Sequence, residues 1–449
     1  MNKVVMFGID GGDYNLITKW KKDLPTLSRL MDGGTYGRSE SVIPTLSCPA
    51  WPCMFTGQTP SELGMYDFLN LETGKIFDSR SWWEKSIFHT LGNKGIKLGL
   101  LNIPISYPPH KVNGFLVTGL GTPTFSNAIY TYPESLQREL GDYEVFPLID
   151  ISIKGKEESN LALLENIHWK RVKALRKLIK KDWNFFACVF YAIDPVQHYF
   201  WHHMDKAHPR YVPNSKYEDV IKKFYIRIDN EIGNTLSVLP KDIDVVIVSD
   251  HGFGPYWKGF NINRWLEQEG YLTFKKEYRK FLDKFQGVAI TLASLSGGKL
   301  TKLVPDWIKA PFTTSRKLQD MTIGLYEAID WSKTVAYSPS ISSGCIYIKD
   351  SKNKTFQENR ISIKEGLGDL GLQVVGGFFN EAPNLFIVGN KYYPMNTRGK
   401  EIWNEHAWSA SHTLDAIFIG YGPNFEHKEV KDMSICKVAP IILDLFKEA

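Results

Sequence analysis

Asp10, Asp250 and His251 directly follow apolar runs that have the pattern of buried strands. One run begins at Lys3 and the other at Asp244, and glycine follows the polar residues in both cases. Such runs predict central strands of a parallel sheet, whose carboxyl ends are where open α/β sheets place their chemistry. Carboxylates and imidazoles at that edge are ligands for zinc-like cations. The alternative is that each Asp only forms a turn or caps a helix.

A third apolar run, Phe185 to Ile193, ends in Asp194, and His198 follows four residues later. If a helical turn begins at Pro195, the carboxylate and the imidazole can reach one ion. His412 precedes another strand-like run, residues 415–420. Alone it is weak evidence, but it supplies a third ligand beside Asp194 and His198.

Ser47 stands just ahead of a short helix predicted over residues 50–56, with Pro49 suited to its first turn. Backbone amides at a helix start favour an anion, and metal coordination activates a hydroxyl for attack on phosphorus or sulfur. Ser47 is also a favourable N-cap residue, and this alternative stays open. Together, six nitrogen and oxygen ligands without a thiolate suit two divalent ions, zinc, manganese or iron, which would clamp an in-line displacement at phosphorus.

Composition places the chain among ordinary globular proteins. It has 449 residues, 43% hydrophobic and 23% charged, enough for one large α/β domain with insertions or for two domains. The net charge of +5 is too small to argue for a nucleic-acid partner. Five cysteines without a CxxC pair favour a reducing compartment, and neither a signal sequence nor a run of about 18 apolar residues is present. We therefore expect a cytoplasmic protein, with peripheral membrane contact left open.

Residues 275–317 differ from the rest of the chain because they hold ten Lys and Arg against three Asp and Glu, a net charge of +7. A basic amphipathic insertion forms a lid, a membrane-surface contact or a cradle for an anionic substrate, and the alternative is a solvated helical cap. We predict an α/β fold with a mostly parallel central sheet flanked by helices. Residues 1–256 and 331–449 form its catalytic domain, and residues 257–330 form the basic helical cap.

Taken together, the motifs resemble the alkaline phosphatase superfamily, in its type I phosphodiesterase/nucleotide pyrophosphatase-like branch. The resemblance rests on GIDGGD (8–13), PTLSCPAWPCMFTGQTPSELGMYDF (44–68), DPVQHYFW (194–201), SDHGFGP (249–255) and SHTLDAIFIGYGP (411–423). It implies one metal ion held by Asp194, His198 and His412. It implies a second ion held by Asp10, Asp250 and His251, with Ser47 as a further ligand. It also implies that Ser47 is the nucleophile and forms a phosphoserine intermediate.

Two positions depart from the family pattern. Nucleotide pyrophosphatases usually have Thr as the nucleophile and Asn three residues later, where this chain has Ser47 and Ala50. The missing amide removes a donor that would stabilise the transition state. Asn102 or Gln197 is the predicted substitute. Aromatic residues, Trp51 and Phe253, are predicted at the mouth of the site.

The expected activity is metal-dependent hydrolysis of a phosphate monoester or diester, either a small molecule or one linked to a lipid or glycan. A sulfatase-like reaction at Cys48 is an alternative, but the Arg that sulfatases need after the Cys is absent. A phosphomutase-like member of the superfamily is another. The alternative from a different class is a binding protein that has kept the fold and lost activity. The sequence predicts no oligomeric state.

Overall fold

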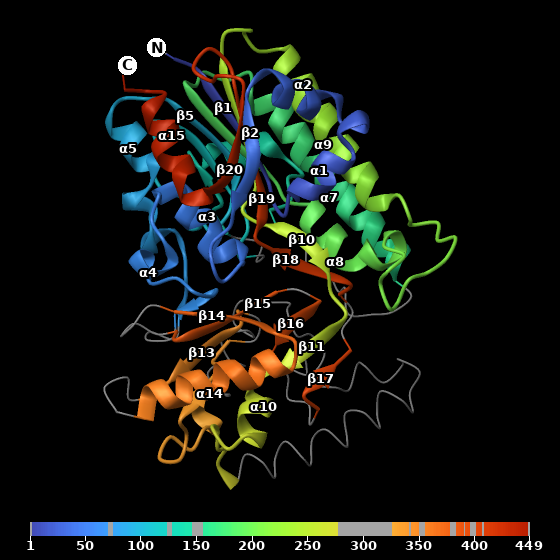
Figure 1. The fold of residues 1–449 in the computed structure, drawn as a ribbon. Coiled ribbons are helices and arrows are strands. Elements are labelled where there is room, and N and C mark those ends of the chain that lie inside the picture. Colours follow the sequence, from blue (N-terminus) through green and yellow to red (C-terminus); the bar gives the residue numbers. More distant parts are fainter. Residues whose placement is uncertain are drawn as a thin grey trace.

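The computed structural model describes residues 2–70, 75–123, 128–145, 156–276, 326–340, 343–349, 355–377, 383–389, 391–395, 401–405 and 408–447. Its centre is a nine-stranded sheet (Figure 1). The strand order is β20 (Lys428–Ser434), β2 (Thr35–Glu40), β19 (Asp415–Tyr421), β9 (Asp244–Val248), β1 (Val4–Ile9), β8 (Phe185–Phe190), β5 (Leu98–Ile103), β6 (Gly114–Thr118) and β7 (Thr131–Tyr132). Strands β9, β1, β8, β5 and β6 are parallel, and β19 and β7 are the antiparallel members. The predicted mostly parallel α/β sheet is confirmed.

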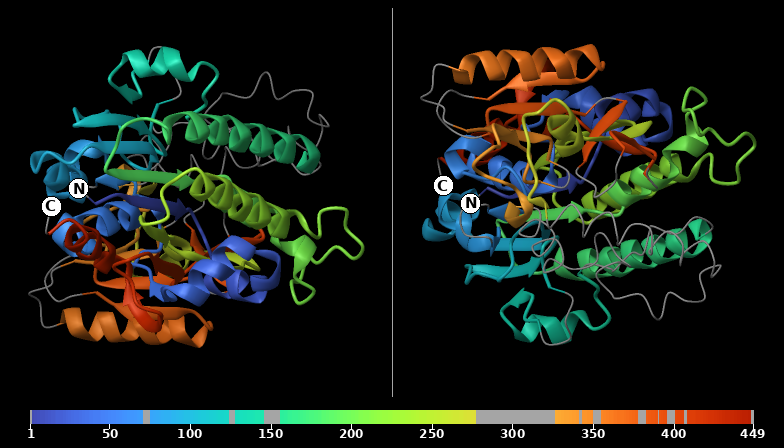
Figure 2. Two further views of the ribbon diagram at one scale, coloured as in Figure 1. Left: turned by 90° about the horizontal axis from the view of Figure 1, so that it is seen from above. Right: turned by 90° about the horizontal axis from the view of Figure 1, so that it is seen from below.

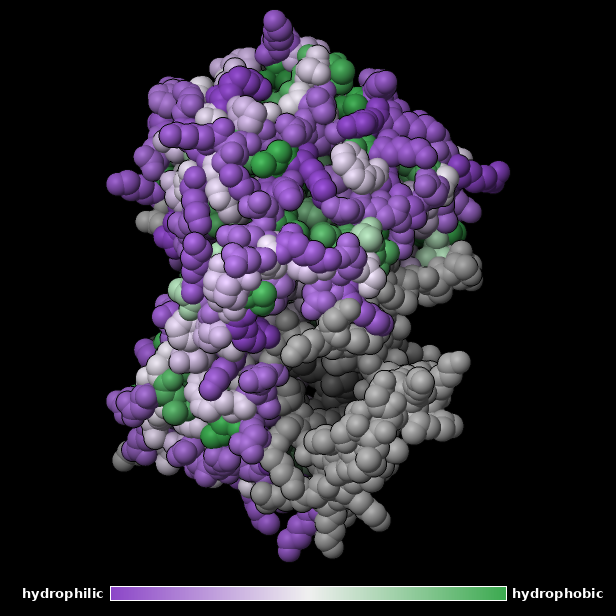
Figure 3. Space-filling view, turned by 90° about the vertical axis from the view of Figure 1, so that its right-hand side faces the viewer, coloured by the Kyte–Doolittle hydropathy of each residue, from purple (hydrophilic) through white to green (hydrophobic). Residues whose placement is uncertain are grey.

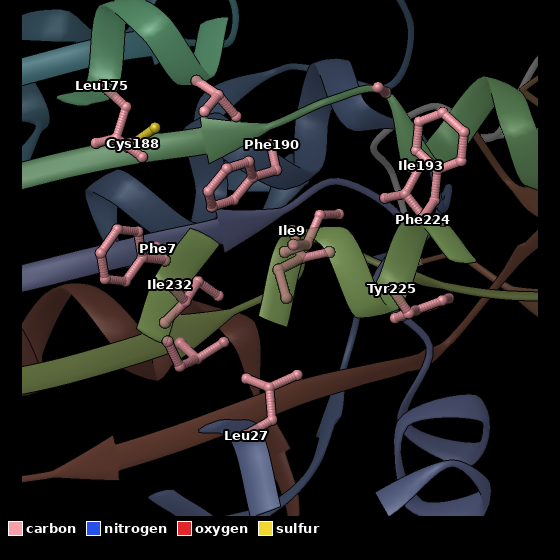
Figure 4. Close-up of a cluster of buried hydrophobic side chains, with 14 of the residues drawn as sticks. Phe7, Ile9, Leu27, Leu175, Cys188, Phe190, Ile193, Phe224, Tyr225 and Ile232 are labelled. Carbon is pink, nitrogen blue, oxygen red and sulfur yellow. The ribbon is translucent and has the colours of Figure 1, made fainter. Parts of the chain in front are cut away.

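Alternate side chains of the central strands face opposite sides of this sheet, as the two-residue period of a strand requires. Phe7 and Ile9 belong to one hydrophobic core, whereas Val4 and Met6 belong to the other. Helices cover both faces (Figure 2). The first face packs against α1 (Tyr14–Lys19), α2 (Pro25–Gly33), α6 (Ser135–Leu140), α7 (Glu157–Leu178), α8 (Ile193–Met204) and α9 (Val220–Ser237), as Figure 4 shows in part. The second packs against α3 (Ser47–Thr56), α5 (Ile87–Asn93) and α15 (Val438–Asp444).

Below the carboxyl edge of the main sheet lies a smaller lobe with its own hydrophobic core (Figure 1). It contains the sheet β16 (Tyr392–Met395), β11 (Lys258–Asn261) and β17 (Trp403–Asn404). A second sheet orders β12 (Ala336–Tyr337), β13 (Cys345–Ile348), β15 (Leu385–Val388) and β14 (Gln373–Gly376), with helices α10 (Ile262–Gln268) and α14 (Thr355–Asp369) beside it. The core of this lobe draws on residues from both sides of position 330, where the sequence analysis placed a domain boundary.

Two short strands join the lobes on the side of the site. Strand β10 (Gly252–Pro255) leaves the main sheet after β9 and pairs with β18 (Ala410–Thr413), which leads into β19. Residues 277–325, which include most of the basic segment 275–317, lie outside the described residues.

Among the coloured residues of the face shown in Figure 3, apolar side chains are scattered rather than continuous. Within the described ranges, every helix is too short or too polar to cross a membrane.

Candidate active site

Three adjacent parallel strands bring three carboxylates to one edge of the sheet. Strand β1 pairs with β8 on one side and β9 on the other. Asp10 follows β1, Asp250 lies two residues after β9, and Asp194 lies in the first turn of α8. All three side chains are buried. The convergence expected from the sequence is therefore present.

The first candidate metal-binding group is Asp194, His198 and His412. His412 Nε2 lies 3.2 Å from Asp194 Oδ2, and His198 Nε2 lies 3.5 Å from the same oxygen. His198 is one helical turn after Asp194 on α8, as the four-residue spacing predicts. His412 arrives from β18, 214 residues further along the chain than His198.

Backbone carbonyls hold the rings of these histidines in one orientation. His198 Nδ1 donates to Ala410 O at 2.8 Å, and His412 Nδ1 donates to Thr45 O at 2.6 Å. A neutral imidazole that donates through Nδ1 has a lone pair on Nε2. The two Nε2 atoms face each other at 3.0 Å. Two acceptors at this distance favour a cation between them, and the carbonyl partners are of the kind that orient metal-ligating histidines.

The second group is Asp10, His251 and again Asp194. His251 Nδ1 contacts Gly252 O at 3.2 Å, so Nε2 of the same ring faces the carboxylates. Asp250 lies beside this group, with Oδ2 3.3 Å from His251 Nε2, whereas its Oδ1 accepts from Gly11 N at 3.1 Å. Asp250 Oδ2 is buried and accepts no hydrogen bond from the residues that the structure describes. An orphaned carboxylate oxygen at this depth fits a metal ligand.

The electrostatics of the pocket favour cation binding. Burial, followed by the charges of Asp250 and Asp194, raises the pKa of Asp10 well above its usual value. Burial also raises the pKa of Asp250 to about 7. Burial acts in the same direction on Asp194, but His198 and His412 outweigh it and lower the pKa of that carboxyl. A divalent ion would compensate this concentration of buried negative charge.

Ser47 lies between these groups. It is the first residue of α3, and its side chain does not cap the helix. Its Oγ lies 3.3 Å from His251 Nε2 and 3.4 Å from Asp10 Oδ1. The N–H groups of Ser47 and Cys48, the first two residues of α3, have no acceptor within the helix, so they and the hydroxyl are available to an anion at the same place.

The four residues predicted to contact substrate are all buried. Trp51 is not at the mouth, because it is fully buried and its Nε1 donates to Asp10 Oδ2 at 2.9 Å. Gln197 is engaged at both ends, since its Nε2 donates to Gly11 O and its Oε1 accepts from Tyr225 OH. Trp51 therefore supports the candidate ligand Asp10, and Gln197 supports the backbone at Gly11 beside it.

Phe253 and Asn102 also differ from the expected positions. The Phe253 ring packs against the rings of His198, His251 and His412, with centroids 4.8, 5.7 and 5.2 Å away. Asn102 Nδ2 donates to Val189 O at 2.6 Å, so this amide donor is already engaged. Trp408, which the sequence analysis missed, stacks on His198 at 4.0 Å. No spacing or motif marks Trp408 in advance.

Gly11 allows this packing. Its φ is +69°, and a Cβ there would lie 2.5 Å from the Phe253 ring. Only glycine combines that backbone conformation with such a close contact. The Asp-Gly pair after β1 is therefore required by the geometry of the site.

A family model described as type I phosphodiesterase/nucleotide pyrophosphatase matches residues 4–310, more than half of the chain. The chain belongs to the type I phosphodiesterase/nucleotide pyrophosphatase family. The matched range contains every candidate ligand except His412. Membership in the type I phosphodiesterase family indicates a hydrolase of the phosphodiesterase or pyrophosphatase type, and it confirms the resemblance identified in the sequence.

Solved structures agree with this phosphodiesterase fold. Murine ectonucleotide pyrophosphatase/phosphodiesterase 5 has a TM-score of 0.53 at 14% identity, covering 99% of this chain and 95% of that chain. An inactive variant of the murine protein in complex with AMP gives the same values. The human protein has a TM-score of 0.52 at 13% identity, covering 99% of this chain and 94% of that chain. No curated protein sequence matches the chain.

Proposed function

We propose that the protein is a metal-dependent phosphoric ester hydrolase in which Ser47 is the nucleophile and is transiently phosphorylated. The observation that carries this proposal is the position of Ser47 Oγ. It lies within 3.4 Å of one candidate ligand from each of two strand ends, at the start of a helix. The N-cap position of α3 belongs to Leu46, so the Ser47 hydroxyl is not used as a cap and contacts the two candidate ligands instead.

Two divalent ions fit the donor set. Asp194, His198 and His412 would hold one, and Asp10, Asp250, His251 and Ser47 would hold the other. Because the donors are nitrogen and oxygen without sulfur, zinc is the preferred ion, with manganese or iron(II) as alternatives. Bound there, the ions supply Lewis-acid stabilisation of charge on phosphate oxygens and lower the pKa of the nucleophile.

Side chains of the protein orient the reacting groups and accept the proton of the Ser47 hydroxyl. The Ser47 hydroxyl donates toward His251 Nε2 or Asp10 Oδ1, both of which are acceptors when the site is deprotonated. Trp51 fixes the Asp10 carboxylate by donating to its other oxygen. The amides at the start of α3 would bind a non-bridging phosphate oxygen, in place of the Asn that Ala50 replaces.

The proposed substrate is a phosphate monoester or diester, either a small molecule or one linked to a lipid or glycan. Peripheral membrane contact through residues 275–317 belongs to the same proposal, as does the absence of a specific nucleic-acid partner. We also propose a cytoplasmic location, which all five cysteines support because they are buried free thiols.

The test compares Ser47→Ala with Cys48→Ala. Each purified variant is assayed with p-nitrophenyl phosphate and bis(p-nitrophenyl) phosphate, and its bound metal is measured by mass spectrometry. We expect Ser47→Ala to reduce turnover by at least about 10³-fold while it retains metal, because the nucleophile is lost. Cys48→Ala should remain active, because burial raises the pKa of the Cys48 thiol well above its usual value.

Two outcomes would contradict the proposal. Full activity of Ser47→Ala would exclude Ser47 as the nucleophile, and loss of activity in Cys48→Ala alone would favour the sulfatase-like alternative. A wild-type protein that folds, binds no metal and turns over neither ester would favour the binding protein.

A further inference from the structure

Asp13 is a buried carboxylate to which the proposed mechanism gives no role. It lies three residues after Asp10, and its Oδ1 caps α1 by accepting from Leu16 N at 2.8 Å. Its second oxygen, Oδ2, accepts from Phe253 N at 3.2 Å. A helix cap needs only one side-chain oxygen, so the bond from Asp13 to β10 indicates a second role.

This bond reaches the peptide group that follows a candidate metal ligand. Phe253 N and Gly252 O belong to the same peptide group, and Gly252 O lies 3.2 Å from His251 Nδ1. The carboxylate of Asp13 accepts from the nitrogen of this group. The oxygen of the group accepts from the imidazole when Nδ1 carries the proton. Asp13, the peptide group and His251 then form a continuous series of hydrogen bonds.

Packing fixes the carboxylate relative to this peptide group. A Cβ at Gly252 would lie 2.7 Å from Asp13 Oδ2 and 2.4 Å from Asp415 O, so the close approach requires glycine. From the other side, Tyr225 OH of α9 accepts from Asp13 N at 2.9 Å and donates to Gln197 Oε1 at 3.1 Å (Figure 4). Asp13 is therefore held in place by its backbone as well as by its side chain.

The position of the proton on His251 decides whether the ring can bind a cation. A neutral imidazole carries one proton, either on Nδ1 or on Nε2. His251 Nε2 lies 3.3 Å from Asp250 Oδ2 and 3.9 Å from Asp10 Oδ1, and these carboxylates favour a proton on Nε2, where it would block a metal ion. A strong acceptor at Nδ1 favours the other tautomer. Asp13 strengthens that acceptor, because hydrogen bonds in series polarise one another.

We propose that Asp13 is a positioning residue that acts through the peptide group between Gly252 and Phe253. It holds the proton of His251 on Nδ1 and leaves Nε2 available to a metal ion. Carboxylates that contact metal-ligating histidines directly act in the same way, and here one peptide group lies between the two side chains. The ligand role of His251 rests on the proposed function, whereas the effect of Asp13 on the tautomer can be measured without metal.

Two variants of Asp13 separate this role from helix capping. Asp13→Ser keeps an oxygen that can cap α1, since serine is a preferred N-cap residue, but it has no second oxygen for Phe253 N. Asp13→Asn keeps the size of the side chain but has one acceptor oxygen for two N–H donors. Asp229→Asn is the matched control, because Asp229 is also buried and accepts from two backbone donors, Thr26 N and Leu27 N, at the start of α2.

The tautomer is measured by nitrogen NMR of the metal-free full-length protein labelled in histidine, at a mildly alkaline pH that favours ionised carboxylates around the ring. Signals that disappear in His251→Gln assign His251 among the 11 histidines. We expect wild type and Asp229→Asn to carry the proton on Nδ1, and both Asp13 variants to shift it toward Nε2. Thermal melts confirm folding, and all three variants should melt at lower temperatures than wild type because each leaves a buried donor unpaired.

Zinc affinity tests the consequence for the candidate metal site. In competition with a chromophoric chelator, both Asp13 variants should bind one of two zinc ions about 10- to 100-fold more weakly than wild type, because a partner of a ligating histidine is lost. Asp229→Asn should bind zinc like wild type. A role of Asp13 in stability alone would move only the melting temperature.

Three outcomes are decisive. Folded Asp13→Ser and Asp13→Asn proteins that keep the wild-type tautomer would overturn the proposal, as would an equal shift in Asp229→Asn. Wild-type zinc affinity in both Asp13 variants would overturn it too. A wild-type protein that binds no zinc would contradict the proposed function instead, and the tautomer alone would then decide the role of Asp13.

Discussion

His198 Nε2 and His412 Nε2 lie 3.0 Å apart although both rings already donate through Nδ1 to backbone carbonyls. Without a proton or a cation between them, the two lone pairs repel. The backbone thus holds an arrangement whose stability depends on what binds there.

Removal of one of these rings should therefore remove metal. We expect His198→Ala to lower zinc affinity by more than about 100-fold, because it deletes a ligand and not only its support. His202→Ala is the control, since His202 lies on the same helix but outside both candidate groups. Competition with a chromophoric chelator measures the zinc affinity of both variants. Equal zinc affinity in the two variants would exclude His198 as a ligand.

Trp51 provides a test of ligand orientation. Trp51→Phe removes the donor to Asp10 Oδ2 and keeps an aromatic ring, so we expect kcat or zinc affinity to fall about 10- to 100-fold. Trp82→Phe is matched to it, because Trp82 is buried in the same core and donates to Ile105 O at 3.0 Å. In Trp82→Phe, only the free energy of unfolding should fall, by about 1 to 3 kcal/mol. A similar loss of activity in both variants would mean that Trp51 acts through packing alone.

Alanine variants at Gly11 and Gly64 separate the effect of backbone strain from the effect of a contact with a neighbouring side chain. Both have positive φ, +69° and +66°, but a Cβ meets the Phe253 ring at Gly11 and nothing within 4 Å at Gly64. The backbone strain of alanine should cost about 1 to 2 kcal/mol of unfolding free energy at either position, and the contact with Phe253 adds to this cost at Gly11. Only Gly11→Ala should also lower activity, because it displaces Phe253 from the three histidines. Steady-state kinetics and denaturant melts distinguish the two effects, and an unchanged kcat in Gly11→Ala would contradict this account.

Metal binding should release protons. Burial raises the pKa of Asp250 to about 7 and also raises the pKa of Asp10 well above its usual value, so the metal-free site holds protons at pH 6. A cation must displace these protons, and zinc affinity should rise about tenfold per pH unit for each proton released. Calorimetry at pH 6 in two buffers of different ionisation enthalpy counts them. Identical heats in both buffers would contradict the prediction.

The raised pKa of Asp250 also determines in which direction pH changes the stability of the folded protein. Because Asp250 holds a proton in the folded metal-free protein between the ordinary Asp pKa and about 7, where the unfolded chain has lost it, the contribution of Asp250 to stability should fall as pH rises across that range.

The sequence analysis located the candidate ligands that lie at strand ends, because an apolar run followed by Asp predicts both a strand and its carboxyl end. Asp10, Asp194 and Asp250 follow from that pattern, and His198 follows from helical spacing. His412 needed the other two ligands before it could be recognised.

The residues that support the candidate ligands could not be predicted from the sequence in the same way. Trp51 donates to Asp10, and the carbonyls of Thr45 and Ala410 orient two histidines, yet these contacts depend on how distant segments cross. The smaller lobe was harder still to predict, because its core combines residues 260–272 with residues 329–387, which local patterns do not connect.

Anomalous diffraction from zinc-loaded crystals tests the central claim most directly. The account predicts two peaks per chain at coordination distances of about 2.0 to 2.2 Å from their ligands. One should lie among Asp194, His198 and His412, and the other among Asp10, Asp250 and His251, with Ser47 Oγ beside the second. Crystals that show no peak at these residues, or only peaks elsewhere on the protein, would contradict it.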